Sequence, residues 1–218
     1  MASTNKTVLI TGSTRRIGLA FAKHYTKAGW NVIGTARANS NTESSSAGGP
    51  THRSAHQQCR YWYPQRARDW HQGRAHEAVR SEYRRAIPHD ALLPNLQLAA
   101  KTNGGASVMQ LSSYLGSIGS YTTETTGFFK QAGYGYSSSK AALNMITRSL
   151  AFDLQPNGIV VVSVHPGYVD TDMTQGKATL KPEDSVMAMT SLIGKLNHES
   201  TGKFFNLDPQ IPLVELPW

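Results

Sequence analysis

Short apolar runs alternate with longer amphipathic stretches along most of the chain. Residues 7–11 and 31–36 are apolar and rich in β-branched side chains, which predicts two strands, the first of them buried. Between them, apolar residues recur at helical spacing from Ile17 to Ala28, and Gly29 follows, which predicts a helix that ends there. The order strand, helix, strand indicates a parallel β-α-β unit.

The second half of the chain continues this alternation. We expect helices at residues 91–101, 136–154 and 182–196, and strands at residues 106–113, 159–164 and 202–206. The strand at 159–164 contains almost only Val and Ile, so it should be buried on both faces. Residues 114–135 are rich in Gly, Ser and Thr. We interpret them as a loop that, together with residues 172–182, shapes a substrate pocket.

Residues 38–90 break the pattern. Residues 40–51 are rich in Ser, Gly and Pro, a composition typical of disordered segments. Across residues 51–90, Val79 and Ile87 are the only Val, Ile, Leu, Met or Phe. Such a stretch buries too little apolar area to offset the entropy of ordering it. We therefore expect one domain over residues 1–218 that contains a disrupted, disordered segment at 38–90.

Length and composition exclude several classes of protein. A chain of 218 residues can form one domain with a full core. No apolar run reaches the length that spans a bilayer, and residues 1–6 lack the apolar part of a signal peptide, so we expect a cytoplasmic protein without a membrane partner. The single cysteine, Cys59, excludes an internal disulfide and a cysteine-based metal site, and we expect no metal.

The net charge of +8 is typical of proteins that bind nucleic acids. Half of this excess lies in residues 51–90, where eight arginines and no lysine stand against four acidic residues. Residues of this segment that could contact phosphates or stack on bases are Arg60, Arg66, Arg68, Arg84, Arg85, Tyr61, Trp62 and Trp70. A basic nucleic-acid-binding protein is thus an alternative, but we expect no nucleic-acid partner, because translation of residues 51–90 in a shifted reading frame would by itself explain this composition.

A glycine-rich turn at residues 12–18 joins the first predicted strand to its helix. In this arrangement, backbone N–H groups and the positive helix end bind a pyrophosphate, although a purely structural turn is the alternative. The second strand ends in Thr35 and Ala36, where a carboxylate would bind an adenosine 2′-hydroxyl. Arg37 follows and, with Arg15 and Arg16 nearby, suits a 2′-phosphate. The alternative for Arg37 is a solvated loop charge.

Tyr136 and Lys140 are four residues apart, so a helix places both side chains on one face. An ammonium group close to a phenol lowers the pKa of the phenol, which can then exchange a proton with an alcohol or carbonyl oxygen. An amphipathic helix with a surface lysine is the alternative. Ser112 and Ser113 end a predicted strand, where open α/β sheets bind ligands, unless they only cap a turn. His165 is assigned no role.

Four motifs occur in the order found in the short-chain dehydrogenase/reductase family: Thr11-Gly12-x-x-x-x-Ile17-Gly18, Ser112-Ser113, Tyr136-x-x-x-Lys140 and Pro166-Gly167. Residues 113–119, 139–144 and 202–205 are most similar to its C-factor-like carbonyl reductases. The resemblance covers residues 6–37 and 91–208. It implies an α/β fold with a doubly wound, Rossmann-like parallel sheet, here incomplete because residues 38–90 do not match.

The resemblance also implies an activity, the transfer of a hydride between NADP(H) and a small carbonyl or alcohol substrate. Tyr136 would be the general acid and base, Lys140 would assist it and hold the nicotinamide ribose, and Ser113 would bind the substrate oxygen. The implied cofactor-binding residues are Gly12, Ser13, Arg15, Ile17, Gly18, Arg37, Tyr136, Lys140, Pro166, Gly167, Val169 and Thr171. Arg15 and Arg37 favour NADP over NAD. Relatives often form homo-oligomers through the helices equivalent to residues 91–102 and 136–154.

Two departures from the family pattern stand out. Arg16 stands at the position of the middle glycine in the family pattern Thr-Gly-x-x-x-Gly-x-Gly. A side chain at this position is expected to crowd the pyrophosphate. In addition, no Asn-Asn-Ala-Gly strand end, and no helix with a catalytic-site Asn, occurs between Arg37 and Ala91. The chain as written therefore lacks a part of the sheet that the family needs.

The genetic code offers an explanation for the second departure. Codons for residues 56–62, read one base later, permit Ile-Asn-Asn-Ala-Gly-Ile, and residues 79–88 in the same shift permit Phe-Glu-Val-Asn-Thr-Val-Gly-Pro-Phe-Leu. Both are sequences of the kind that the family carries at those places. We interpret residues 51–90 as translated out of frame, through a gene-model error or a damaged gene. The protein is then either an enzyme in its true frame or a catalytically impaired relic.

Overall fold

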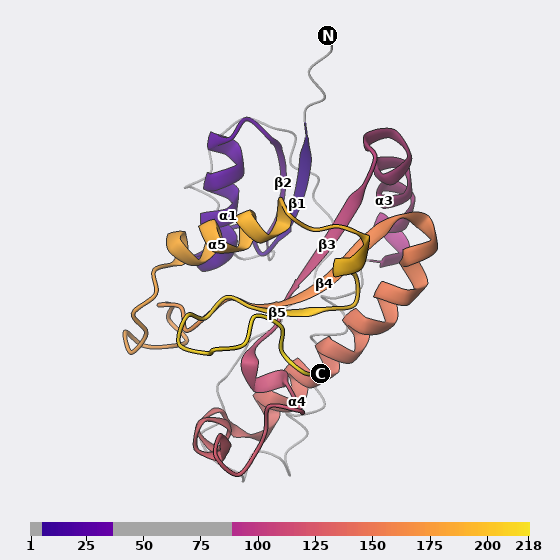
Figure 1. The fold of residues 1–218 in the computed structure, drawn as a ribbon. Coiled ribbons are helices and arrows are strands. Elements are labelled where there is room, and N and C mark those ends of the chain that lie inside the picture. Colours follow the sequence, from indigo (N-terminus) through magenta and orange to yellow (C-terminus); the bar gives the residue numbers. More distant parts are fainter. Residues whose placement is uncertain (1–5, 37–88) are drawn as a thin grey trace. The chain divides into compact units, whose positions relative to one another are not determined.

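The computed structural model describes residues 6–36 and 89–218 (Figure 1). The described residues divide into two units, one of residues 6–36 and 168–187 and the other of residues 89–167 and 188–218. In both units the strands are parallel. The α5 helix (Pro182–Ile193) begins in the first unit and ends in the second.

The first unit contains the predicted β-α-β arrangement, formed by β1 (Thr7–Thr11), α1 (Arg16–Lys27) and β2 (Asn31–Thr35). β1 and β2 are paired in parallel register along their full length. Helix α1 buries Ala20, Phe21 and Tyr25. The Tyr25 ring also lies 4.7 Å from the ring of Trp30, and its partial burial raises the pKa of the Tyr25 phenol.

The prediction that the first strand is buried is wrong for most of its residues. Ile10 is buried, whereas Thr7 and Thr11 are exposed and Val8 and Leu9 are half-buried. Among the described residues β1 pairs with β2 alone, so its pairing within this unit does not bury the strand on both sides.

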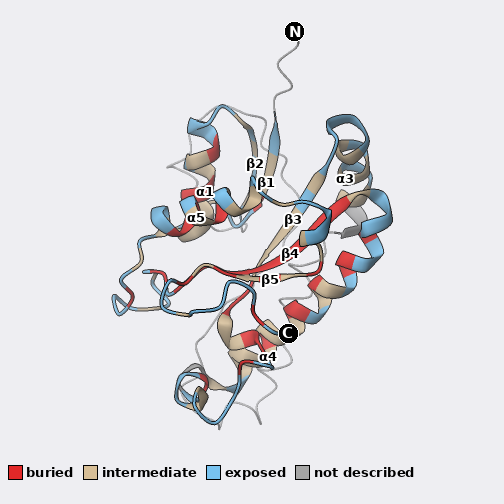
Figure 2. Cartoon of the chain, viewed as in Figure 1, coloured by how far each residue is buried: buried red, intermediate tan, exposed pale blue. Residues whose placement is uncertain are grey.

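The second unit is built on a three-stranded sheet of order β3-β4-β5. Its elements are α3 (His89–Asn103), β3 (Ala106–Leu111), the 3₁₀ turn η2 (Tyr114–Gly116), α4 (Thr126–Leu154), η3 (Gln155–Asn157), β4 (Ile159–His165), η4 (His198–Ser200) and β5 (Phe204–Asn206). The central strand β4 is buried at every residue, as its run of Val and Ile predicts (Figure 2). Helix α4 packs against β4.

The core of the second unit lies between α4 and the sheet. Leu150, Ala151 and Leu154 of α4 are buried together with Ile159 and Val161 of β4. Each large aliphatic side chain buried in this way contributes about 1.5–3 kcal/mol relative to an exposed one. This packing fixes α4 along the sheet, and α4 is the helix that carries Tyr136 and Lys140.

Residues 114–135 are not the continuous loop that their composition predicts. η2 forms at once after Ser113, and α4 begins at Thr126 and is interrupted at Gly133, which has φ 72° and ψ 156°. The early helical turn is anchored by Phe129, which is buried against the rings of Tyr114 and Tyr121 at centroid distances of 5.6 and 4.5 Å. Aromatic contacts therefore outweigh the loop-forming composition here.

The prediction of a Rossmann-like α/β fold with an incomplete sheet is confirmed for the described residues, whose strands form a two-stranded and a three-stranded parallel sheet. The other expected helices and strands are present, with bounds that differ by a few residues. The expected disorder of residues 38–90 falls outside the described residues, apart from His89 and Asp90, which belong to α3. Among the described helices, none is long and apolar enough to cross a membrane.

Candidate active site

The glycine-rich turn of the first unit is pinned by the end of β2. The N–H of Gly12 donates a hydrogen bond of 3.2 Å to Oγ1 of Thr35, and the N–H of Ser13 donates one of 3.0 Å to the Thr35 carbonyl. Ser13 Oγ donates to the same carbonyl at 3.3 Å. Thr35, which the sequence places where other proteins carry a ribose-binding carboxylate, thus holds the turn in shape.

Gly18 allows α1 to start directly against this turn. A Cβ atom at Gly18 would lie 2.2 Å from the carbonyl oxygen of Gly12 and 2.9 Å from its carbon, which no side chain can tolerate. The neighbouring Ile17 is half-buried in the first turn of the helix. The predicted cofactor-binding residues Gly12, Ser13, Ile17 and Gly18 therefore lie together in one tightly built turn.

The start of α1 fits a phosphate group. Arg15 is the N-cap residue, its backbone is extended, and it makes no side-chain capping hydrogen bond. The first turn of α1 contains no acidic residue, and Arg15 itself is exposed beside it. Free N–H groups at a helix start and a nearby cation attract an anion. The predicted Arg37 lies outside the described residues.

Arg16 follows in the left-handed backbone region, with φ 53°. Glycine adopts this region freely, whereas other residues pay a steric cost of about 1–2 kcal/mol. The Arg16 guanidinium forms an ion pair with Asp172, with Nε 3.0 Å from Oδ2. The backbone at this position is thus that of the glycine which the family pattern has there, although the side chain is an arginine.

Residues 168–180 of the first unit contain two further predicted cofactor residues. Val169 is buried and pairs with Leu180 in an isolated parallel bridge. The N–H of Thr171 donates a hydrogen bond of 3.0 Å to Oγ1 of Thr174, which itself donates to the Val169 carbonyl at 3.1 Å. The other two, Pro166 and Gly167, are buried in the second unit directly after β4.

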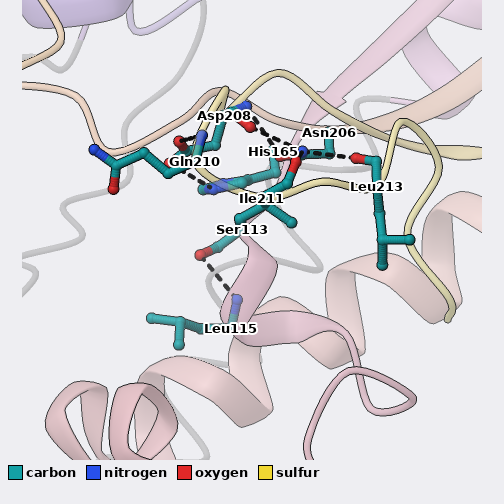
Figure 3. A network of polar contacts seen from close by, with 8 residues as sticks. All are labelled: Ser113, Leu115, His165, Asn206, Asp208, Gln210, Ile211 and Leu213. Carbon is teal, nitrogen blue, oxygen red and sulfur yellow. Dashed lines mark hydrogen bonds and ion pairs between the residues drawn. The ribbon is translucent and has the colours of Figure 1, made fainter. Parts of the chain in front are cut away.

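The two serines after β3 have different hydrogen-bonding roles. Ser112 is buried, and its hydroxyl donates a hydrogen bond of 2.6 Å to Oδ1 of Asn144. Ser113 is the N-cap of η2, and its Oγ accepts a hydrogen bond of 3.3 Å from the N–H of Leu115 (Figure 3). Among the described residues the Ser113 hydroxyl hydrogen has no acceptor, so this serine fits the predicted role of a donor to a substrate oxygen.

Tyr136 and Lys140 lie on α4 after the break at Gly133. Lys140 Nζ donates a hydrogen bond of 3.0 Å to the carbonyl oxygen of Leu111, the last residue of β3, and lies 6.0 Å from the centroid of the Tyr136 ring. Both side chains are half-buried. The lysine therefore bridges the helix of Tyr136 and the strand that leads into Ser113.

His165, which was assigned no role, ends β4 in a buried polar cluster (Figure 3). Its Nε2 lies 3.7 Å from Oδ2 of Asp208. The loop beyond β5 folds around the amide of Asn206, whose Nδ2 donates to the carbonyls of Ile211 and Leu213 at 3.0 and 2.7 Å. A shallow cavity of about 320 Å³ is lined by residues 206–209 and 211–214.

Sequence reasoning missed three residues that hold these elements in place, Thr35 and Asp172 in the first unit and Asn144 in the second. Thr35 and Asp172 hold the glycine-rich turn through contacts that span 23 and 156 residues, and no local pattern predicts such contacts. Asn144 could have been found, because an asparagine four residues after Lys140 falls on the same helix face and is too polar for an unpaired core position. The nucleic-acid alternative rests on residues 60–85, which lie outside the described residues.

A parallel α/β fold with a glycine-rich turn after its first strand is typical of dinucleotide-binding proteins. The sequence pattern of the short chain dehydrogenase family matches residues 99–181. C-signal of Myxococcus xanthus is 41% identical over 128 residues, which cover 59% of this chain and 68% of C-signal. The chain belongs to the short chain dehydrogenase family.

Other relatives and solved structures agree with this assignment. An uncharacterized oxidoreductase of Schizosaccharomyces pombe is 36% identical over 114 residues, which cover 44% of this chain and 42% of that protein. The carbonyl reductase Sniffer of D. melanogaster has a TM-score of 0.70 and 25% identity, with 98% of this chain and 99% of that chain covered. The NADPH-bound carbonyl reductase from chicken fatty liver, at 23% identity and a TM-score of 0.73, shares the fold over 98% of this chain and 94% of its own.

The chain thus spans about two thirds of C-signal and less than half of the fission-yeast oxidoreductase. Its family and its likeness to carbonyl reductases are established by these matches. The individual roles of the predicted site residues, Ser113, Tyr136 and Lys140 included, stay predictions.

Proposed function

We propose that the chain is a carbonyl reductase that transfers a hydride between NADP(H) and a small carbonyl or alcohol substrate, with Tyr136 as general acid and base. The observation that carries the proposal is the position of Lys140. Its ammonium is held by the Leu111 carbonyl at 3.0 Å and lies 6.0 Å from the Tyr136 ring. The lysine thus links the helix that carries Tyr136 to the strand that leads into Ser113, the two residues that would act on the substrate oxygen.

The proton transfers follow from this arrangement. A bound nicotinamide cofactor supplies or accepts the hydride. During reduction, the Tyr136 hydroxyl donates its proton to the substrate oxygen, which also accepts a hydrogen bond from the Ser113 hydroxyl. The Lys140 ammonium stabilises the phenolate that remains. During oxidation, the phenolate of Tyr136 takes the proton back from the alcohol.

We propose NADP(H) rather than NAD(H) as the cofactor. The start of α1 would hold the pyrophosphate through backbone N–H groups, and the exposed Arg15 would bind the 2′-phosphate. At the end of β2, Thr35 stands in place of a ribose-binding carboxylate, and its hydroxyl is already engaged by Gly12. Replacing Arg15 by Gln should then weaken NADPH binding several-fold and leave NADH binding almost unchanged, measured by fluorescence titration.

The proton role of Tyr136 can be tested directly. NADPH-dependent reduction of a panel of small ketones, aldehydes and quinones would be measured for the purified protein and for Tyr136→Phe. Loss of a positioned acid and base should lower kcat by about 10²–10⁴-fold. Tyr134→Phe is the matched control, because Tyr134 lies on the same helix and is 66% exposed. Equal turnover by both variants would reject the assignment.

A catalytically impaired relic is the second candidate, and Arg16 is the observation that favours it. Arg16 is a non-glycine residue with φ 53° in the phosphate-binding turn, and its own guanidinium is paired with Asp172. Both features disfavour pyrophosphate binding at this turn. NADPH titration of the purified 218-residue protein separates the candidates. Tight binding contradicts the relic. The out-of-frame origin that we propose for residues 51–90 is checked by sequencing the transcript across codons 37–91.

We further propose that the chain forms homo-oligomers through α3 and α4. Large apolar side chains are exposed on both helices, with Leu98 at 61%, Met145 at 67% and Phe152 at 58%. Such side chains on neighbouring helices are typical of an interface between copies. Light scattering coupled to size-exclusion chromatography should give the mass of an oligomer, and Met145→Glu with Phe152→Glu should convert it to the monomer.

A further inference from the structure

The amide of Asn144 is the centre of a buried polar cluster in the second unit. Asn144 is 3% exposed, and its Oδ1 accepts hydrogen bonds from the hydroxyls of Ser112 at 2.6 Å and Ser163 at 2.9 Å. Its Nδ2 donates a hydrogen bond of 3.0 Å to the carbonyl oxygen of Gly116. One side chain of α4 therefore binds the end of β3, the middle of β4 and the last residue of η2.

The orientation of this amide is fixed by the Gly116 carbonyl. A hydroxyl can donate or accept, so the two serines would tolerate either end of the amide. The Gly116 carbonyl only accepts, so rotation of the amide by half a turn would place two oxygens against each other in a buried site. A buried acceptor left without a donor costs about 1–3 kcal/mol. The cluster therefore permits one arrangement of its members.

The cluster encloses Ser113 on both sides along the chain. Ser112 precedes it, and η2, which Ser113 caps, ends at Gly116. Both flanking residues are bound to Asn144. Asn144 lies one helical turn beyond Lys140, so the same helix face carries the lysine and the amide.

We propose that Asn144 is a positioning residue that fixes the Ser113 segment to the helix carrying Tyr136 and Lys140. The two groups that would contact the substrate oxygen come from different elements, η2 and α4, and the amide is a direct hydrogen-bonded link between those elements. A fully satisfied buried network of this kind makes the local structure rigid and unique. The catalytic part of this inference rests on the proposed function, whereas the mechanical part does not.

The third arm of the cluster provides a matched control. Ser163 lies within β4 and binds Asn144 from the interior of the sheet. Ser163→Ala removes one hydrogen bond from Asn144 but leaves the links to Ser112 and Gly116 intact. If the amide acts through the Ser113 segment, this variant should behave almost like the wild type, although it loses a bond from the same oxygen.

Two variants of Asn144 separate shape from hydrogen bonding. Asn144→Leu keeps a side chain of similar length and removes all three bonds. Asn144→Asp keeps both acceptor oxygens but, when ionised, places an oxygen against the Gly116 carbonyl. A protonated aspartic acid can donate to that carbonyl again, and burial favours protonation. The Asp variant should therefore regain function as the pH is lowered.

The first measurement needs no activity. Hydrogen exchange would be followed at the amides of Gly116 and Ser117, which donate to the carbonyls of Ser113 and Tyr114 at 2.8 and 2.9 Å. We expect exchange there to be at least about tenfold faster in Asn144→Leu, with the β4 amides unchanged and with less than a twofold effect in Ser163→Ala. Unchanged exchange at Gly116 and Ser117, or faster exchange throughout β4, overturns the proposal.

The second measurement is turnover. For a misplaced catalytic group, kcat should fall by about 10–100-fold in Asn144→Leu with little change in KM, and in Asn144→Asp the loss should shrink toward acidic pH. An Asn144→Leu variant with wild-type kcat overturns the positioning role. If the wild type itself shows no turnover, the proposed function has failed, and the exchange measurement still decides whether Asn144 holds the Ser113 segment.

Discussion

The Nε atom of Arg16 donates a hydrogen bond of 3.0 Å to Oδ2 of Asp172, and the Nη2 atom contacts the same oxygen. The pair joins the glycine-rich turn to the segment that follows Val169, in the same unit. Arg16 enters it from a backbone with φ 53°. An exposed ion pair is screened by water and stabilises little, so the pair does not compensate fully for the unfavourable backbone.

Replacing Arg16 by glycine should improve both stability and cofactor binding. Glycine relieves a backbone strain of about 1–2 kcal/mol, but its extra freedom in the unfolded chain offsets about 0.5–1 kcal/mol of this stabilisation. We expect the free energy of unfolding to rise by up to about 1 kcal/mol, measured by urea denaturation. NADPH affinity should rise as well, because the side chain no longer crowds the turn.

Arg15→Gly is the matched control for this change. Arg15 is the adjacent arginine and has φ −159°, an extended backbone that any residue adopts. The substitution removes the same charge without relieving strain, so it should lower the free energy of unfolding and weaken NADPH binding. A gain in stability from both substitutions would show that charge, and not backbone conformation, is responsible.

The ion pair should also give the protein a pH-dependent stability in acid. The hydrogen bond and charge of Arg16 hold the pKa of the Asp172 carboxyl below its ordinary value. A carboxyl with a lower pKa in the folded state stabilises above its unfolded pKa of about 3.9, and this contribution disappears as the pH falls through the folded value. The difference in unfolding free energy between wild type and Asp172→Asn should therefore vanish at low pH.

The same comparison in an Arg16→Gln background tests the cause. Without the guanidinium, Asp172→Asn should change the free energy of unfolding equally at neutral and acidic pH. Raising the salt concentration to about 1 M should likewise reduce the change in unfolding free energy that Asp172→Asn causes when Arg16 is present, since salt screens an exposed pair. A pH-dependent difference that survives the loss of Arg16 would assign the effect to another partner of Asp172.

Gly116 must be a glycine because η2 touches α4 at Lys140. A Cβ atom there would lie 2.6 Å from the Lys140 Cβ and 2.8 Å from its backbone carbon, so the backbone would have to move. Gly116→Ala should lower the free energy of unfolding by about 1–3 kcal/mol and reduce turnover, because Lys140 is displaced. Gly127→Ala, where a Cβ meets nothing within 4 Å, should be neutral or stabilising in the same denaturation and turnover assays.

Much of the fold could be predicted because its elements have local signals. The Val and Ile run of β4 and the glycine-rich turn before α1 each carry their own pattern, and both are found where expected. The start of α4 could not be predicted in this way. It depends on Phe129 packing against Tyr114 and Tyr121, a contact whose energy is invisible in a stretch rich in Gly, Ser and Thr.

The residues of the candidate site also fall into two groups, those with a local sequence signal and those that depend on contacts between elements. Helical spacing indicates the Tyr136–Lys140 pair, and the strand end indicates Ser112 and Ser113, because helix and strand periodicity fix where such side chains lie. The choice of Ser113 comes from the family resemblance. The groups that hold them could not be read from spacing. Asn144 and the Leu111 carbonyl act across elements, and their partners become neighbours only when α4 packs on the sheet.

Trp218 should be a strong contributor to stability, because it closes the second unit over β5. Its ring lies 5.5 Å from that of Phe204, which is fully buried, and the Arg148 guanidinium lies 5.4 Å from the Trp218 ring. Its carbonyl also accepts a hydrogen bond of 3.0 Å from the N–H of Gly119. Trp218→Ala removes the aromatic packing and the cation–π contact, and should lower the free energy of unfolding by about 2–4 kcal/mol.

The comparison that tests this prediction uses the second aromatic ring beneath the same guanidinium. Phe152 lies 5.5 Å from Arg148 but is 58% exposed, and within the described part of the chain it packs on no buried ring. In the monomer, Phe152→Ala should therefore lower the free energy of unfolding by less than about 1 kcal/mol in the same urea titration. If the two variants were equally destabilised, the cation–π contact would be the main contribution, and both substitutions should then have almost no effect in an Arg148→Ala background. A larger effect of Trp218→Ala that persists in the Arg148→Ala background instead assigns the stability to packing on Phe204.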